Sequence, residues 1–121
     1  MPGGRISHIE FPADDMERAK RFYRAVAGWE PEPMEGFDDI EFFQTAHEEG
    51  GAIGRRGVGT GQVVRAYITV PSLDASLAAV EEHGGSVVEG ATEVPGMGRY
   101  AVVLDSEGSE IGLWEDPPAA G

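Results

Sequence analysis

Cysteine is absent from this chain of 121 residues. Its absence excludes disulfide bridges, thiolate metal sites and a cysteine nucleophile. Long apolar runs are missing too, since none approaches the roughly 18 residues that a membrane-spanning helix requires. The first residues lack the basic and then apolar pattern of a signal peptide. We therefore expect a single domain over residues 1–121, located in the cytoplasm and without a membrane partner.

Basic residues are scarce: nine Lys and Arg face 22 Asp and Glu, which gives a formal net charge of −13. This balance excludes nucleic acid as a partner, because binding to phosphates requires a basic surface. Two interpretations of the acidity stay open. The acids could form a solvated coat in a salt-rich cytoplasm, which their spread along the chain favours. Alternatively, they could line a cleft that attracts a cationic ligand.

The first half of the chain has the pattern of a strand, a helix and three further strands. Residues 6–11 alternate in polarity and precede a proline, which predicts a strand. Asp14 and Glu17 form a capping box, and Gly28 predicts the end of the helix that follows. The buried stripe expected for this helix is Met16, Ala19, Phe22, Tyr23 and Val26. The later strands are predicted over 29–34 (an edge strand containing Pro31 and Pro33), 40–45 and 50–55, followed by a mobile glycine-rich loop.

The second half repeats this order after a shift of 57 residues, which places Gly28 on Gly85. A strand over 63–70 precedes Ser72, which we expect to cap a helix that buries Leu73, Leu77 and Val80. The remaining strands are predicted over 86–89, 99–104 and 110–115, with a hairpin turn over 105–108. The repeat predicts an α+β fold of two βαβββ modules, at about 5–57 and 62–116. Together the modules would form a curved mixed sheet with a concave pocket.

Four segments carry a family resemblance: H-x-E-F-P-A-D-D-x-E-R-A-K-R-F-Y (8–23), G-W (28–29), V-P-G-M-G-R-Y (94–100) and D-S-E-G-S-E-I-G-L-W-E (105–115). In combination they resemble the vicinal oxygen chelate family, which contains glyoxalases, bleomycin-resistance proteins and extradiol dioxygenases. The resemblance implies paired βαβββ modules around a deep pocket, usually in a homodimer. It also implies a divalent metal, held by four side chains, that stabilises an enolate or activates oxygen.

The four ligand positions of the family are mostly occupied here by residues that cannot bind a metal. The first falls on His8, which can coordinate, and the second falls near Gly54. The third falls on or next to Arg65, which is always protonated, and the fourth falls on Gly112. The two glycines replace the glutamates that also supply the base in glyoxalase-type members, and they would leave room where ligands normally project. A dioxygenase would need two histidines and a carboxylate around iron. A divalent metal is therefore possible but not favoured.

The candidate ligand-binding residues share predicted faces of the strands. They are His8, Glu10, Arg65, Tyr67, Met97, Arg99 and Trp114. Arg65 could form a salt bridge with Glu10 or bind the carboxylate of a ligand. Tyr67 and Trp114 could stack on a planar ligand or simply pack against neighbouring strands. Met97 and Arg99 follow a glycine-rich turn that could fold over the pocket, and we interpret His47 and His83 as structural.

Four functional hypotheses follow, and the sequence leaves open whether the protein is an enzyme. The first is a protein that binds a small organic ligand without the usual four-ligand metal site. The second is a metal-dependent lyase, isomerase or dioxygenase with a rearranged ligand set. The third is a resistance protein that sequesters a cationic drug, and the fourth is a structural or interaction role without a small ligand.

Overall fold

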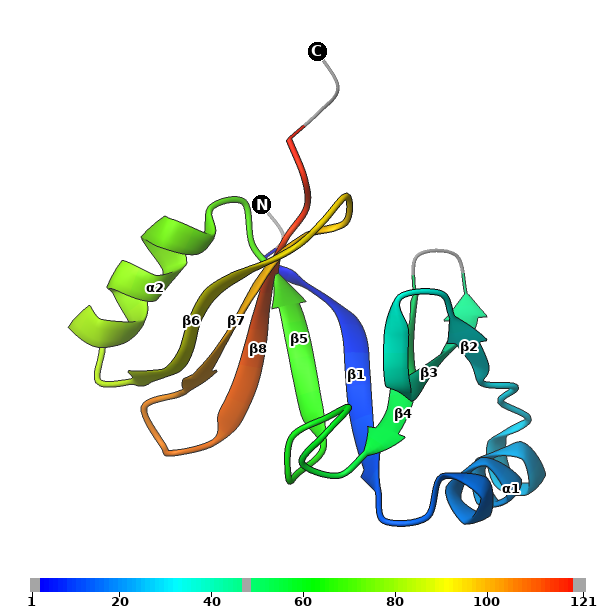
Figure 1. The fold of residues 1–121 in the computed structure, drawn as a ribbon. Helices are drawn as coiled ribbons and strands as arrows, with labels where there is room; N and C mark the ends of the chain where they lie inside the picture. Colours follow the sequence, from blue (N-terminus) through cyan, green and yellow to red (C-terminus); the bar gives the residue numbers. More distant parts are fainter. Residues whose placement is uncertain (1–2, 47–48, 119–121) are drawn as a thin grey trace. The chain divides into compact units, whose positions relative to one another are not determined.

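The structure is a computed structural model, and it describes residues 3–46 and 49–118. The elements along the chain follow the predicted order of two βαβββ modules (Figure 1). They are β1 (Arg5–Ala13), α1 (Met16–Ala27), β2 (Glu32–Met34), β3 (Phe37–Ala46), β4 (Glu49–Arg55), β5 (Arg65–Thr69), α2 (Leu73–Glu82), β6 (Ser86–Val94), β7 (Gly98–Leu104) and β8 (Glu110–Glu115). The predicted α+β class is confirmed. Among the described residues, no helix has both the length and the apolar character needed to cross a membrane.

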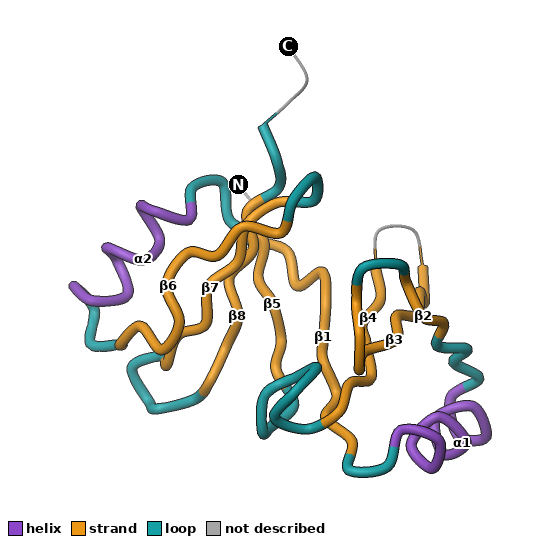
Figure 2. The backbone as a smooth tube through the Cα atoms, viewed as in Figure 1, coloured by secondary structure: helices purple, strands orange, loops and turns teal. Residues whose placement is uncertain are grey.

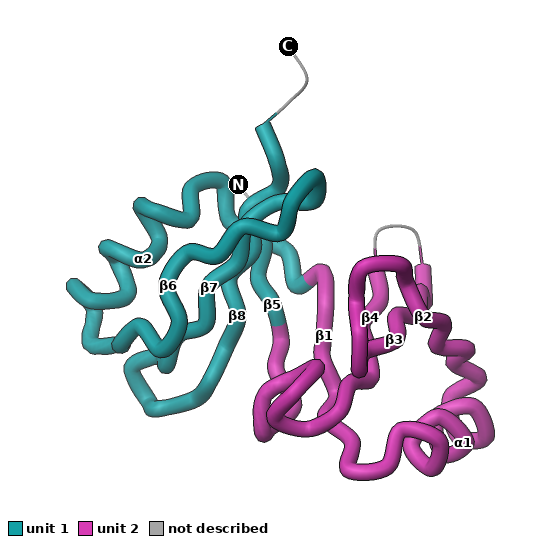
Figure 3. The backbone as a smooth tube through the Cα atoms, in the orientation of Figure 1, with its two compact units in different colours: residues 1–6, 67–121 teal, residues 7–66 magenta. Residues whose placement is uncertain are grey.

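The chain divides into two compact units, which Figure 3 distinguishes by colour. The N-terminal unit comprises residues 7–66, and the C-terminal unit comprises residues 1–6 and 67–121. The boundaries therefore fall within strands β1 and β5. Each unit is described below by itself.

The N-terminal unit is a mixed sheet with the strand order β2-β3-β4-β1. β1 runs parallel to β4, and the two other pairs are antiparallel. β2 lies at the edge of this sheet, as Pro31 and Pro33 predicted, because proline cannot donate to a neighbouring strand; of the two, only Pro33 lies within β2. Helix α1 packs on one face (Figure 2), where Ala13, Phe43 and Ile53 form the buried core.

Helix α1 begins one residue later than the capping box predicts. Its N-cap is Asp15, whose carboxylate accepts a hydrogen bond from the Arg18 backbone N–H at 3.0 Å. The prediction of Asp14 as N-cap is wrong, because that carboxylate turns to the guanidinium of Arg56 instead. The predicted end is confirmed: Gly28 adopts a φ of 72°, in the left-handed region that glycine tolerates best.

The apolar stripe of α1 is only partly buried. Met16, Ala19 and Tyr23 pack against the core of the N-terminal unit, as predicted. The prediction is wrong for Phe22 and Val26, which are 57% and 67% exposed. At about 100° per residue, these two positions lie on the flank of the helix, beyond the face that meets the sheet.

The C-terminal unit contains the strand order β5-β8-β7-β6, with β5 parallel to β8 and the other pairs antiparallel. Ser72 caps α2 as predicted, since its hydroxyl accepts a hydrogen bond from the Ala75 N–H at 3.2 Å. The predicted stripe of α2 packs on the sheet around the buried core of this unit. The hairpin turn is confirmed as well: the Asp105 carboxylate accepts hydrogen bonds from the backbone N–H groups of Glu107 and Ser109.

Candidate functional site

Three polar side chains meet on the N-terminal unit, on the face of its sheet opposite α1. Phe11 packs toward α1, so strand alternation turns His8 and Glu10 to the other side. The Glu10 carboxylate lies 3.3 Å from His8 Nε2 and 3.8 Å from Arg65 Nη1. The side chains of His8, Glu10 and Arg65 are 28%, 14% and 12% exposed. Of the two roles left open for Arg65, the structure contains the ion pair with Glu10.

Two phenylalanines that the sequence analysis missed lie beside this cluster. The ring centroid of Phe42 is 6.2 Å from that of His8, and the Phe37 ring meets Phe42 edge-on at 5.3 Å. Strand alternation could have predicted the position of Phe42. Neighbouring residues of a strand face opposite sides of the sheet, and Phe43 belongs to the core under α1, so Phe42 faces the other side. We call His8, Glu10, Phe37, Phe42 and Arg65 the polar–aromatic face.

Strand β4 places only a small side chain between the two walls of this face. Ala52 pairs with Glu10 of β1 on one side and with Phe42 of β3 on the other. The Ala52 side chain is buried. Glu10 and Phe42 therefore lie two strands apart, on either side of the fully buried Ala52.

Gly54, expected to leave open space, is covered by the loop after β4. A Cβ atom at Gly54 would lie 2.5 Å from the Thr60 methyl group and 3.1 Å from the Gly59 carbonyl carbon. Thr60 is buried, and its hydroxyl donates to the Gly54 carbonyl at 3.4 Å. Backbone hydrogen bonds from Gly59 and Thr60 to the Arg55 carbonyl hold this predicted mobile loop. The expectation of room at Gly54 is therefore wrong.

Gly112, in the C-terminal unit, is covered in the same way. A Cβ atom there would overlap the ring of Tyr67, which is only 6% exposed and pairs with Gly112 across β5 and β8. The ring therefore packs over the glycine, and the expected room at this position is filled. Trp114 is half-buried against Gly98, and its indole N–H donates to Asp116 at 2.9 Å.

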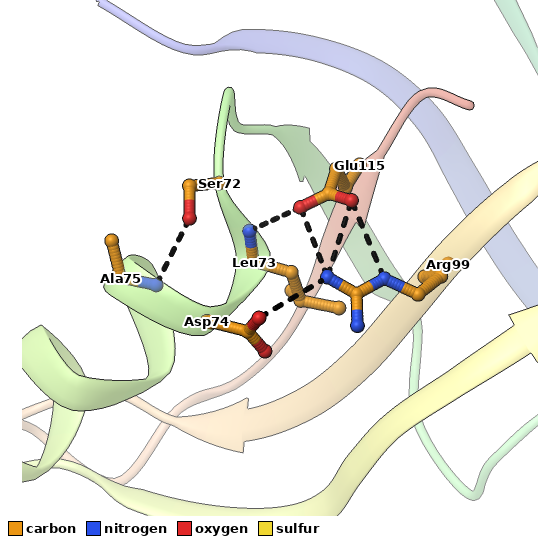
Figure 4. A network of polar contacts seen from close by, with 6 residues as sticks. All are labelled: Ser72, Leu73, Asp74, Ala75, Arg99 and Glu115. Atoms are coloured by element: carbon orange, nitrogen blue, oxygen red, sulfur yellow. Dashed lines mark hydrogen bonds and ion pairs between the residues drawn. The ribbon is translucent and has the colours of Figure 1, made fainter. Parts of the chain in front are cut away.

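Arg99 lies on the other face of the C-terminal unit, next to α2 (Figure 4). Its guanidinium contacts the Glu115 carboxylate at 3.2–3.3 Å and Asp74 at 3.6 Å. Glu115 also accepts a hydrogen bond from the Leu73 N–H at 2.6 Å. This hydrogen bond and the Arg99 charge lower the pKa of Glu115, while Glu115 raises the pKa of Arg99. Arg99 thus ties β7 and β8 to the start of α2.

The remaining predicted residues are dispersed. Met97 is exposed in the turn between β6 and β7, where its N–H donates to the Val94 carbonyl. His83 is the C-cap of α2, with its backbone N–H bonded to the Ala79 carbonyl. His47 lies outside the described residues. The structure therefore brings together His8, Glu10 and Arg65, and it places Arg99 on the α2 side of its sheet.

An open depression of about 760 Å³ lies in the C-terminal unit beside the start of α2. None of the predicted ligand-binding residues lines it. Its two acidic residues, Glu115 and Asp116, already accept hydrogen bonds from within the unit.

The residues present do not fit a four-ligand metal site. Within the described ranges 3–46 and 49–118, no three His, Asp or Glu side chains gather as metal ligands. Gly54 and Gly112 have no donor atoms, and the protonated guanidinium of Arg65 cannot coordinate. Side chains placed at the two glycines would meet Thr60 and Tyr67.

Comparison with known proteins agrees with this fold. Residues 5–113 match the family model of the Glyoxalase/Bleomycin resistance protein/Dioxygenase superfamily. The chain belongs to this superfamily. The member described here is 31% identical over 123 residues to a glyoxylase-like domain-containing protein of Didymella fabae, covering 94% of this chain and 95% of that protein.

A Mycobacterium tuberculosis (strain CDC 1551 / Oshkosh) protein that carries the name glyoxylase CFP32 is 27% identical to this superfamily member over 119 residues. The match covers 93% of this chain and 46% of that protein, so the chain spans about half the length of its mycobacterial relatives.

Solved structures share the fold at low sequence identity. A hypothetical protein, BH1468, from Bacillus halodurans C-125 superposes with a TM-score of 0.70 at 14% identity, over 98% of both chains. A Streptomyces coelicolor methylmalonyl-CoA epimerase in complex with 2-nitronate-propionyl-CoA gives a TM-score of 0.63 at 18% identity, over 97% of this chain and 100% of that chain.

Proposed function

We propose that this superfamily member binds a small organic ligand on its polar–aromatic face, without the four-ligand metal site of its family. One observation carries the proposal: three of the four expected ligand positions hold Gly54, Arg65 and Gly112, and Thr60 and Tyr67 cover the two glycines. These substitutions remove the metal donors and the space in which replacement donors would project.

The chemistry of the polar–aromatic face supports a ligand site. Small-molecule sites combine aromatic surface with a few polar groups that orient the ligand. Here the Glu10 carboxylate lies between the His8 imidazole and the Arg65 guanidinium, and Phe42 adjoins His8. The Arg65 charge offsets that of Glu10, so this face offers little attraction for a cationic drug. Sequestration of such a drug is therefore the weaker alternative.

A metal-dependent lyase or dioxygenase with rearranged ligands is the other alternative. This alternative is supported by the names of similar proteins, two of which are called glyoxylase or glyoxylase-like and one of which is a methylmalonyl-CoA epimerase. On the N-terminal unit, the metal of such an enzyme would have to bind His8 and Glu10, whose Nε2 and Oε2 atoms lie 3.3 Å apart. The homodimer and the cytoplasmic location expected from the sequence stay predictions.

Metal analysis of the purified full chain tests the proposal directly. After incubation with Zn, Ni, Fe or Mn and removal of excess metal, we expect far less than one equivalent per chain. His8→Ala should leave this value unchanged, as should His83→Ala, the matched control at the end of α2. About one equivalent of metal that His8→Ala abolishes and His83→Ala preserves would overturn the proposal. Turnover of hemithioacetals or catechols by the metal-loaded protein would count against it in the same way.

A further inference from the structure

We propose that the exposed face of helix α1 binds a short acidic segment of another protein, a segment that also carries large apolar side chains. This exposed face consists of Arg18, Arg21, Phe22 and Val26. It does not depend on the small-ligand site proposed above, because the polar–aromatic face lies on the side of the sheet opposite α1.

Helix α1 packs against its sheet with one side only. That side carries Met16, Ala19 and Tyr23, which contact the core of the N-terminal unit. At about 100° per residue, the four residues of the exposed face fall within an arc of about 140° outside it. All four side chains are exposed, Phe22 by 57% and Val26 by 67%. The helix therefore presents two arginines and two apolar side chains together to solvent.

Basic residues are concentrated on α1. The helix contains four of the nine Lys and Arg residues of the chain but only one acid, which gives it a formal charge of +3. Because the whole chain carries −13, the residues outside α1 carry −16. An acidic segment on α1 therefore meets the one helix whose charge is opposite to its own.

The arginines of α1 are available to a partner, whereas its lysine is not. Lys20 is held between Glu17 at 2.7 Å and Glu41 at 3.0 Å. Arg18 and Arg21 make no ion pair within residues 3–46 and 49–118. The hydrogen bond from the Arg18 N–H lowers the pKa of the Asp15 carboxyl, and the charges of both arginines add to this effect from a distance. Like charges three positions apart repel on a helix, so this spacing favours an anionic partner.

Phe22 is a rigid aromatic anchor. Its ring meets Tyr23 edge-on, with centroids 5.1 Å apart and planes at 88°. Tyr23 stacks on Trp29 at 5.0 Å, and Trp29 stacks on Phe43 of the core at 4.1 Å. An anchor held in this way loses little freedom on binding. Val26 extends the apolar surface by one helical turn, and aromatic and arginine side chains together are typical of the energetically important part of an interface.

The observations favour a short segment over a larger anionic surface. The Debye length at physiological salt is about 8 Å, so a segment confined to α1 meets mainly the charges of the helix. Nucleic acid or an anionic membrane would also meet the −16 of the surrounding chain. A membrane would gain only Phe22 and Val26, since the sheet covers the other side of α1. A second copy of this chain also carries −13, and long-range repulsion opposes its approach.

Three labelled peptides of about twelve residues test the proposal by fluorescence anisotropy. The first repeats Glu-Glu-Leu-Leu, the second has glutamine in place of glutamate, and the third has serine in place of leucine. We expect the first to bind with a Kd below about 1 mM and at least about tenfold more tightly than the second, because only carboxylates form charge-assisted hydrogen bonds with arginine. The third should bind several-fold more weakly than the first. Raising NaCl from about 50 to about 500 mM should weaken the first several-fold.

Variants with matched controls locate the contacts. Arg18→Gln and Arg21→Gln should each weaken the glutamate–leucine peptide about fivefold. Arg24→Gln removes the same charge on another flank of α1 and should weaken it no more than about twofold. Phe22→Ser should weaken it several-fold, whereas Val88→Ser, at a side chain of equal exposure in β6, should not.

These variants should all fold. Glutamine favours helices nearly as well as arginine and keeps the backbone N–H that Asp15 accepts at position 18. Circular dichroism checks each variant, and the arginine variants decide the proposal if Phe22→Ser unfolds. Backbone amide shifts on addition of the glutamate–leucine peptide to the wild-type chain should centre on residues 18–26.

Several results would overturn the proposal. They are equal binding of the glutamine peptide, no binding up to about 1 mM, equal losses in Arg18→Gln and Arg24→Gln, and shifts centred away from α1. Self-association in sedimentation velocity that Phe22→Ser abolishes would instead make this face an interface between copies. Binding to vesicles of phosphatidylserine and phosphatidylcholine that needs Phe22 would make it a membrane surface. None of these measurements reports metal content, which tests the proposed function separately.

Discussion

Replacing Gly112 with alanine should destabilise the protein although it adds only one methyl group. The new Cβ atom would overlap the ring of Tyr67, whose Cγ would lie 2.7 Å away. Overpacking of a buried strand costs about 1–3 kcal/mol. Loss of glycine's flexibility in the unfolded chain offsets about 0.4–1 kcal/mol of this. We therefore expect a net loss of about 1–2 kcal/mol, or a fall in Tm of about 4–8 °C for a domain of this size.

The assay is urea unfolding followed by circular dichroism, with Gly90→Ala as the matched control. A Cβ atom at Gly90, also in a strand of the C-terminal unit, would meet nothing within 4 Å. Gly90→Ala should therefore be neutral or slightly stabilising. Equal stability of the Gly112→Ala and Gly90→Ala variants would refute the reasoning.

A double-mutant cycle identifies the obstacle. In a Tyr67→Val background the ring is gone, so Gly112→Ala should cost at least about 1 kcal/mol less than in the wild-type chain. If the two substitutions are additive, the Tyr67 ring is not what excludes a side chain at position 112. The same ring would then not be the obstacle to a larger side chain, such as glutamate, at this position.

Three further predictions concern other contacts. The pKa of Glu115 is lower in the folded state than the ordinary 4.5, so the ionised carboxylate stabilises the fold fully above pH 4.5, and this stabilisation is lost as the pH falls through the lower folded value. Glu115→Gln should therefore flatten this part of the plot of stability against pH in acid unfolding. An unchanged plot would contradict the role given to Glu115. Asp39 has a φ of 61°, in the left-handed region that asparagine tolerates and β-branched valine does not. In urea unfolding, Asp39→Val should therefore lower the free energy of unfolding by about 1–2 kcal/mol more than Asp39→Asn does. Phe22 is exposed and Tyr23 packs against the core, so Phe22→Ser should change the free energy of unfolding by no more than about 0.5 kcal/mol, whereas Tyr23→Ala should lower it by about 3 kcal/mol. Similar losses for the two variants would contradict the exposure of Phe22.

Local sequence patterns predicted the elements well where neighbours in the chain decide the structure. Ser72 and Gly28 marked helix ends because caps and left-handed turns involve residues only a few positions apart. The N-cap of α1 was misplaced by one residue, since two adjacent aspartates can both cap. Arg56, distant in sequence, engages Asp14 and leaves Asp15 as the cap.

The candidate site divides in the same way between sequence and structure. Residue identity alone shows that Gly54, Arg65 and Gly112 cannot donate to a metal, because donor atoms are a property of the side chain. What occupies the space beside the two glycines depends on tertiary structure. Thr60 covers Gly54 through a loop held by backbone hydrogen bonds, and Tyr67 covers Gly112 through the register of β5 against β8.

The sequence by itself therefore determined the repeated βαβββ order, most helix ends and the absence of metal-donor atoms at Gly54, Arg65 and Gly112. Only the tertiary structure decided that Phe42 lies beside His8 and that Arg99 binds Glu115 near α2. The physical reason is that periodicity and capping are short-range properties. Cross-strand contacts instead depend on registers and bulges, such as the irregular pairing of β2 with β3, that join residues far apart in the chain.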